Sequence, residues 1–226
     1  MKSIAIGPMH SSLDTIIFDL DGTLIDSSAS IVESLKKAFL KCQITPKEFL
    51  NSDIIGPPLM KILRSLSGTS DQKILNNLAN EFKSHYDNDG YKKTIVFSGI
   101  NRMLRDLKNS NLKIYIATNK RIYPTNQIID MLNWGELFNG IYALDSIHPN
   151  AYSKGHLLSE IIKVNNLTRD KTVYVGDRED DYKAAIESGL SYTMATWGYA
   201  VMDEVQINVK KVNKPIALSN SLLKHN

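Results

Sequence analysis

The sequence predicts an α/β protein built on a doubly wound parallel sheet, with an α-helical cap domain inserted into it. Strand-like and helical segments alternate from about residue 100 to residue 195, the order that gives right-handed crossovers and a parallel, Rossmann-like sheet. The stretch from about residue 27 to residue 95 instead shows helical periodicity without a strand pattern. We therefore expect an α/β core formed by residues 1–26 and 96–226 and a helical cap formed by residues 27–95.

The opening strand carries the first chemical signal. An apolar run, Thr15–Phe18, predicts a buried strand, and Asp19 and Asp21 follow it on the same side of an extended chain. Gly22 then permits a sharp turn. Two carboxylates this close repel, which raises one pKa unless a cation lies between them. The pattern indicates a divalent metal site, an acid and nucleophile pair, or both; the alternative is an acidic turn, because Asp-Gly is a common turn dipeptide.

The remaining elements follow from periodicity and from turn residues. We expect Ser27 or Ser28 to cap the first cap helix. The expected cap helices run to about Lys41, from Thr45-Pro46 over a short stretch, from Leu59 to Leu66 and from Asp71 to about Tyr86, with a break at Gly56-Pro57-Pro58. In the core we expect strands at 112–117, 140–144, 171–175 and 191–195, and helices at 100–108, 124–132, 155–164 and 180–188. The tail from about Val201 shows no clear pattern.

Polar groups end three of the apolar strands. Asp19 and Asp21 follow the first strand, Thr118 and Asn119 the second, and Asp177 a third. Because parallel strands all point the same way, these ends must lie on one edge of the sheet, where open α/β sheets bind ligands. Carboxylates suit magnesium, and hydroxyl, amide and backbone N–H groups suit anionic oxygens. The edge is therefore predicted to bind a phosphate group and a magnesium ion.

Two further residues extend this set. Lys154 begins a helix, where its ammonium group and the helix N-terminus both favour an anion. Asp181 lies one turn into the next helix and can face the metal. The alternatives are a solvated lysine, turn residues at Thr118 and Asn119, and acidic residues at 180 and 181 that only complement a helix dipole. The joint placement of all these residues on one edge favours the site.

These stretches resemble the motifs of the haloacid dehalogenase-like hydrolases, over nearly the whole chain from about residue 14 to residue 200. The four matching stretches, in family order, are Phe18–Leu24, Ala117–Lys120, Lys154 and Val175–Asp181. The helical insertion is similar to the family's helical cap, and Thr196–Tyr199 is similar to the segment that closes the core in phosphoglycolate phosphatase-like members. One departure is Gly155, where members often have proline.

The resemblance implies phosphate monoester hydrolysis through an aspartyl-phosphate intermediate. It makes Asp19 the nucleophile and Asp21 the general acid and then base. It assigns phosphate binding to Thr118, Asn119 and Lys154. It assigns the magnesium ion to Asp19, Asp21 (through its backbone carbonyl), Asp177 and Asp181.

Two other classes of function stay open. The same fold supports sugar-phosphate mutases, phosphonatases and dehalogenases, although Asp21 argues against a dehalogenase, and a non-catalytic phosphate- or partner-binding protein is a third reading. The cap is expected to set specificity, with Lys61 and Arg64 as candidates to reach an anionic group, or else as parts of a solvated helix face. Phosphoglycolate is a candidate substrate by resemblance only; sugar phosphates and nucleotides are others.

Composition limits the partners and the compartment. The net charge of +3, without a basic run, argues against nucleic acid binding, so the expected partner is a small-molecule phosphate ester. No apolar run is long enough to span a bilayer, and the first 12 residues lack a signal-peptide pattern, so we expect no membrane association. The single cysteine, Cys42, excludes an internal disulfide and fits a cytoplasmic protein. The sequence does not specify an oligomeric state.

Overall fold

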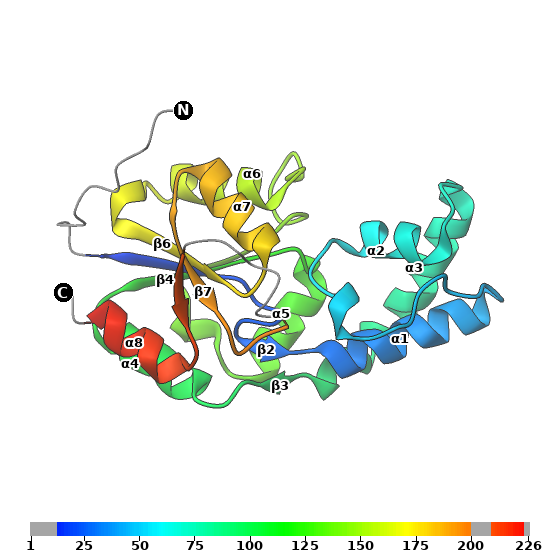
Figure 1. The fold of residues 1–226 in the computed structure, drawn as a ribbon, viewed down its shortest axis with the longest axis horizontal. Helices are drawn as coiled ribbons and strands as arrows, with labels where there is room; N and C mark the ends of the chain where they lie inside the picture. The colour runs from blue at the N-terminus through cyan, green and yellow to red at the C-terminus, as the bar shows by residue number, and fades with distance from the viewer. Residues whose placement is uncertain (1–12, 200–208, 224–226) are drawn as a thin grey trace.

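The computed structural model describes residues 13–199 and 209–223 and confirms the parallel sheet (Figure 1). Six strands pair in parallel in the order β5-β4-β1-β6-β7-β8. Their bounds are β1 Thr15–Phe18, β4 Lys113–Thr118, β5 Gly140–Ala143, β6 Thr172–Gly176, β7 Ser191–Ala195 and β8 Lys210–Val212. The chain builds outward from β1 on one side and then on the other, so the point where the strand order reverses lies at β1.

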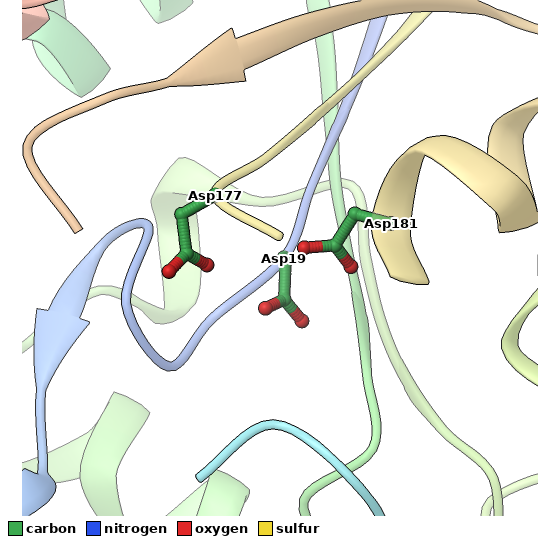
Figure 2. Close-up of side chains that lie close together, drawn as sticks. All are labelled: Asp19, Asp177 and Asp181. Carbon is green, nitrogen blue, oxygen red and sulfur yellow. The ribbon is translucent and has the colours of Figure 1, made fainter. Parts of the chain in front are cut away.

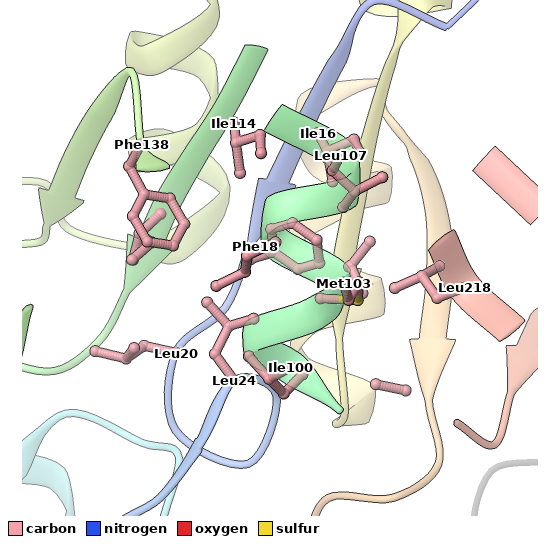
Figure 3. Close-up of a cluster of buried hydrophobic side chains, with 14 of the residues drawn as sticks. Ile16, Phe18, Leu20, Leu24, Ile100, Met103, Leu107, Ile114, Phe138 and Leu218 are labelled. Carbon is pink, nitrogen blue, oxygen red and sulfur yellow. The ribbon is translucent and has the colours of Figure 1, made fainter. Parts of the chain in front are cut away.

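Helices cover both faces of this sheet. One face packs against α4 (Ile100–Asn109), α5 (Ile122–Met131) and α8 (Pro215–Leu223), and the other against α6 (Lys154–Val164) and α7 (Glu179–Ser188). Strand β1 alternates between the two: Ile16 and Phe18 belong to the first cluster and Ile17 to the second. Figure 3 shows the first cluster, with Met103 of α4 over the strands. Because both faces are buried, the central strands read as unbroken apolar runs.

The helical insertion forms a third apolar cluster of its own. It contains α1 (Ser28–Lys41), α2 (Leu59–Ser67) and α3 (Gln72–Tyr86), with short 3-10 turns at Ser52–Ile54 and Gly90–Lys93. Leu35 of α1, Leu63 of α2 and Leu78 of α3 are all fully buried in this cluster. Figure 1 shows this cap extending from one end of the sheet. The chain enters and leaves it through a small antiparallel pair, β2 (Ile25–Asp26) and β3 (Ile95–Val96), and we propose that the domain boundaries lie there, at residues 27 and 95.

The structure differs from the sequence prediction at two places. Thr45-Pro46 does not begin a helix: after Gln43, which has a positive φ of 56°, the chain is held against α2 by a bond from the Lys47 N–H to the Leu66 carbonyl. The tail also adds β8 and α8, which we did not predict; residues 200–208 and the first 12 residues lie outside the described part. Further short 3-10 turns occur at Gly135–Leu137 and Arg169–Lys171. None of the described helices is long and apolar enough to cross a membrane.

Candidate active site

The polar strand ends meet at the centre of one sheet edge. β4 and β6 flank β1, so Thr118, Asp19 and Asp177 follow three adjacent strands. All three side chains are buried. The structure therefore brings together the residues that the sequence placed on this edge.

Three carboxylates form the heart of the site. Asp19, Asp177 and Asp181 each offer one oxygen atom, and these oxygens lie within 4.8 Å of one another. Figure 2 shows the three side chains converging from two strand ends and from the start of α7. Each of the three side chains is almost fully buried. Buried charges of one sign this close are costly unless a cation compensates them.

One lysine supplies part of that compensation. Lys154 Nζ lies 2.9 Å from Asp19 Oδ1 and 2.7 Å from Asp181 Oδ1. Burial and the neighbouring carboxylates of Asp181 and Asp177 still hold the pKa of Asp19 well above its ordinary value, although Lys154 opposes them. Burial lowers the pKa of Lys154, but the charges of Asp181 and Asp19 outweigh it and raise that pKa overall, so the side chain is an ammonium ion.

Asp177 is fixed by the chain around it. Its Oδ1 accepts from the Thr23 hydroxyl at 3.2 Å and its Oδ2 from the Tyr199 N–H at 2.9 Å. Burial and the charge of Asp181 raise its pKa to about 7. Gly22 has a φ of +86°, and a Cβ there would lie 2.4 Å from Asp177 Oδ2. Gly22 is thus required for two reasons: the turn has a positive φ there, and the Asp177 carboxylate occupies the space of a side chain.

Asp181 faces the cluster and also holds its own helix start. Its Oδ2 accepts the Arg178 N–H at 3.1 Å, and its Oδ1 accepts the Tyr174 hydroxyl at 3.0 Å. Asp180 is exposed, which agrees with a role limited to the helix dipole. Asp180 and Asp181 therefore have different surroundings, and of the two only Asp181 joins the site.

This donor set fits a hard divalent cation. Three buried carboxylates offer oxygen ligands, which Mg²⁺ and Ca²⁺ prefer, and one ammonium ion cannot balance three negative charges. Burial, and then the neighbouring carboxylates, raise the pKa values of Asp19 and Asp177, and a bound cation would oppose both shifts. The residues that would hold the ion are Asp19, Asp177 and Asp181; the ligand role of the Asp21 backbone carbonyl stays a prediction from the family resemblance.

The side chain of Asp21 belongs to a different group. Its Oδ1 accepts from the hydroxyl of Ser27 and lies 3.1 Å from Lys120 Nζ. Ser27 occupies the N-cap position of α1, but its side chain does not cap the helix as we expected, because it bonds to Asp21. Burial opposes the charge on Lys120, yet Asp21 and the Tyr86 phenol raise its pKa to about 12. Asp21, the second carboxylate of the first motif, is thus held by Lys120, to which we assigned no role from the sequence.

Thr118 and Asn119 occupy the predicted edge but use their side chains differently. The Thr118 hydroxyl accepts the Lys120 N–H at 3.1 Å, within the loop that follows β4. The Asn119 amide nitrogen donates to the Gly56 carbonyl of the cap at 2.8 Å. The side-chain nitrogen of Asn119 therefore binds the cap, and the phosphate-binding role of Asn119 stays a prediction.

A small pocket between core and cap opens beside Asp21. It encloses about 60 Å³ and is lined on the cap side mainly by apolar side chains, with Asn119 and Lys120 on the core side. Lys61 and Arg64 are exposed on α2, and neither lines this pocket; Lys61 instead borders a separate groove on the cap. The cap residues that reach the site were missed in the sequence, because Gly56 and Ser52 act through their carbonyl groups. Tyr86 ends a helix whose apolar pattern indicated only packing.

The model of one protein family, described as haloacid dehalogenase-like hydrolase, matches residues 16–195. The chain belongs to this family. The matched residues include the three buried carboxylates, Lys154 and the whole helical insertion. The resemblance that the motifs suggested is confirmed.

Relatives of this chain carry different kinds of name, and a kinase and a phosphatase are among them. A phosphoglycolate phosphatase of Cereibacter sphaeroides is 29% identical over 81% of this chain and 85% of its own length. The tyrosine-protein kinase PtkA of Mycobacterium tuberculosis is 28% identical over 83% of this chain, which spans only 64% of that relative. The crystal structure of a predicted phosphatase from Clostridium acetobutylicum superposes with a TM-score of 0.84 at 25% identity and covers 95% of this chain and 100% of its own.

The departure from the family pattern at Gly155 has a structural counterpart. A Cβ at this position would lie 2.1 Å from Glu187 Oε2, and Glu187 also accepts the Ser153 hydroxyl at 3.2 Å. Ser153 in turn caps α6 by accepting the His156 N–H. This chain thus starts the helix of Lys154 with a serine cap, and glycine makes room for the Glu187 side chain beside it.

Proposed function

We propose that the protein is a magnesium-dependent phosphatase that hydrolyses a small phosphate monoester through an aspartyl-phosphate intermediate. One observation carries the proposal: Asp19 lies at a strand end between a buried lysine and two further buried carboxylates. That arrangement orients a nucleophilic carboxylate and supplies both a cation site and an anion site next to it. Family membership and the phosphoglycolate phosphatase relatives support the same reading.

In the first step, Asp19 attacks phosphorus in line, a P–O bond to its carboxylate forms, and the bond to the leaving oxygen breaks. Lys154 Nζ, 2.9 Å from Asp19 Oδ1, is placed to neutralise a phosphate oxygen beside the nucleophile. Thr118 and the backbone of Asn119 donate to the other oxygens. A bound Mg²⁺ would supply further neutralisation of the phosphate charge.

Asp21 handles the proton in both steps. It gives a proton to the departing oxygen and then takes one from the water that attacks the aspartyl-phosphate. Its carboxyl group borders the pocket where the leaving group would lie. In the second step the water oxygen bonds to phosphorus, the P–O bond to Asp19 breaks and inorganic phosphate leaves. Asp19 is then again a free carboxylate, and Asp21 again carries the proton with which it started.

The pocket supports a small leaving group. Its volume of about 60 Å³ has room for a few water molecules, which favours a short carbon skeleton with the cap in this position. Ile31, Leu35 and Phe82 make one wall apolar. A short aliphatic body with a phosphate at one end is the substrate class that this shape supports, and a cytoplasmic location, where such esters occur, is part of the proposal.

The experiment is a panel of phosphate monoesters assayed for phosphate release with Mg²⁺, with Ca²⁺ and with a chelator. We expect turnover with Mg²⁺, loss with chelator, and poor replacement by Ca²⁺, which takes more ligands at longer distances. Radiolabelled phosphate should be trapped on wild-type protein after acid quench and be absent from Asp19→Asn. Equal phosphate release without divalent metal would contradict the proposal. Stable transfer of the label to a protein tyrosine would instead support a tyrosine kinase activity, which is the activity in the name of the relative PtkA.

A further inference from the structure

The loop between β4 and α5 connects the cap to the carboxyl group of Asp21. Lys120 in this loop has a buried ammonium group, 3.1 Å from Asp21 Oδ1 on the core and 2.8 Å from the Tyr86 hydroxyl on the cap. The same ammonium lies 4.7 Å from the centre of the Tyr86 ring, within cation–π distance. A single cation therefore joins a cap side chain to the carboxylate that handles the proton.

Tyr86 moves only as the cap moves. It ends α3, is 1% exposed, and stacks on Phe82 with ring centroids 5.3 Å apart inside the cap cluster. Its hydroxyl can reach Lys120 only when the cap lies against the core, as it does here. The distance from Tyr86 to Lys120 is thus a direct report of cap position at the site.

The contacts on Asp21 fix one of its two oxygens. Lys120 and the Ser27 hydroxyl, which lies at the entry to the cap, both contact Oδ1. Within the described residues, this leaves Oδ2 as the oxygen that can face the pocket bordered by Asp21. A carboxyl group held in this way cannot rotate freely, so Oδ2 stays aimed where a leaving oxygen would lie.

A neighbouring contact joins the same two regions without touching Asp21. Arg121, the next residue of the loop, binds Asp87, the next residue after Tyr86, through two bonds of 2.9 Å and 2.5 Å. This pair also holds the cap to the core, and Arg121 lines the same pocket as Asp21. Of these two adjacent bridges, only the Lys120 bridge makes a described contact with the Asp21 carboxyl group.

We propose that Lys120 and Tyr86 are positioning residues through which the cap, when it lies against the core, aims the carboxyl group of Asp21 at the leaving-group oxygen. The inference rests on the proposed function, because it concerns the proton that Asp21 gives. It links proton donation to cap closure, so the acid is aligned only when substrate is enclosed and water is excluded. A merely structural role for Lys120 would stabilise the closed state equally for every substrate.

The test compares two esters that differ mainly in the basicity of the leaving oxygen. The best alkyl phosphate of the panel and its analogue that carries fluorine on the second carbon from the ester oxygen are similar in size, but the fluorinated alcohol leaves with less need of a proton. Tyr86→Phe keeps the ring and removes the hydroxyl. Rapid quench, with saturating Mg²⁺, should show formation of the aspartyl-phosphate slowed about 10-fold for the alkyl ester and about twofold or less for the fluorinated one.

Asp87→Asn is the matched control, because it weakens the parallel bridge one residue away. It should change both esters by the same factor and leave their rate ratio at the wild-type value. Lys120→Met should shift the ratio in the same direction as Tyr86→Phe and further, with partial recovery in Lys120→Arg. Circular dichroism and thermal unfolding check the fold of each variant, and Tyr86→Phe decides the outcome if Lys120→Met does not fold.

The possible failures are distinguishable. If wild-type protein turns over both esters and Tyr86→Phe leaves their ratio unchanged, the inference is overturned and the phosphatase proposal stands. The same holds if Asp87→Asn shifts the ratio as much as Tyr86→Phe does. If wild-type protein releases phosphate from no ester, both proposals fall together.

Discussion

The two buried lysines of the site, Lys154 and Lys120, differ in whether their contact partners come from the core alone or from both the core and the cap. Lys154 contacts Asp19 and Asp181, and all three residues belong to the core. Lys120 contacts Asp21 of the core and Tyr86 of the cap. The side of the site that holds the proposed nucleophile, Asp19, therefore has its lysine contacts within the core, whereas the side that holds the proposed acid, Asp21, is completed by the cap.

This difference separates two requirements of the chemistry. A nucleophile and a cation site can be ready before substrate arrives, since fixed charges in a rigid core need no rearrangement when it binds. Proton transfer is useful only once the leaving group is enclosed, and the cap supplies that condition.

The largest effect should come from the nucleophile itself. Asp19→Asn keeps the shape and removes the attacking oxygen, so turnover of every ester should fall by a factor on the order of 10⁴ or more. Steady-state phosphate release measures it, with circular dichroism as the check on the fold. Activity retained at a substantial fraction of wild type would remove Asp19 from the mechanism.

Removal of Lys154 should damage the same side less severely. Lys154→Met deletes a donor to the phosphate, and we expect a fall of about 10²-fold for alkyl and fluorinated esters alike. Unfolding free energy without metal should drop by about 3–5 kcal/mol, because Asp19 and Asp181 lose their buried partner, and Mg²⁺ should restore part of it. Lys163→Met, an exposed lysine on the same helix, is the control and should change neither quantity.

The smallest effect should be a pH dependence of the response to metal. Without metal, the pKa of Asp177 is about 7 in the native state against an ordinary 3.8. Between these two pH values the folded protein therefore keeps a proton that the unfolded chain has released. Stability should therefore fall as pH rises from 3.8 to about 7. Mg²⁺ displaces that proton, so its stabilisation should grow over the same range.

Thermal unfolding with and without Mg²⁺, at pH about 5 and about 8, measures this difference. Asp180→Asn changes an exposed carboxylate next to Asp181 and should leave the pH dependence intact. A stabilisation by Mg²⁺ that is equal at the two pH values would show that protons and metal do not compete at this cluster.

Much of the fold follows from the sequence for a simple reason. The strands of the sheet are buried on both faces, so runs such as Thr15–Phe18 are continuously apolar and easy to detect. The edge strand β8 and helix α8 were not predicted, because Lys210 and Lys211 are exposed and the sequence before them shows no helix or strand periodicity. The short helix expected at Thr45 failed because a tertiary bond from Lys47 to Leu66 overrides the local signal.

The core half of the site was equally accessible to sequence reasoning. Carboxylates at strand ends must meet on one edge, whichever loops connect them, and Asp19 and Asp177 do so. The cap half was not, since Gly56 acts through its carbonyl group and Tyr86 through a hydroxyl at the end of a packed helix. Lys120 is the last residue of the second motif, but its two partners, Asp21 and Tyr86, come from segments far apart in the chain.

The measurement that tests the account most directly is the first chemical step of Asp21→Asn with the matched pair of esters. An alkoxide leaves poorly without a proton, whereas the fluorinated alkoxide is a weaker base. Rapid quench with saturating Mg²⁺ should show the alkyl ester slowed by about 10² to 10⁴ and the fluorinated ester much less. Asp19→Asn should abolish the step for both. Equal slowing of the two esters by Asp21→Asn would contradict the division of the site into a nucleophile side and an acid side.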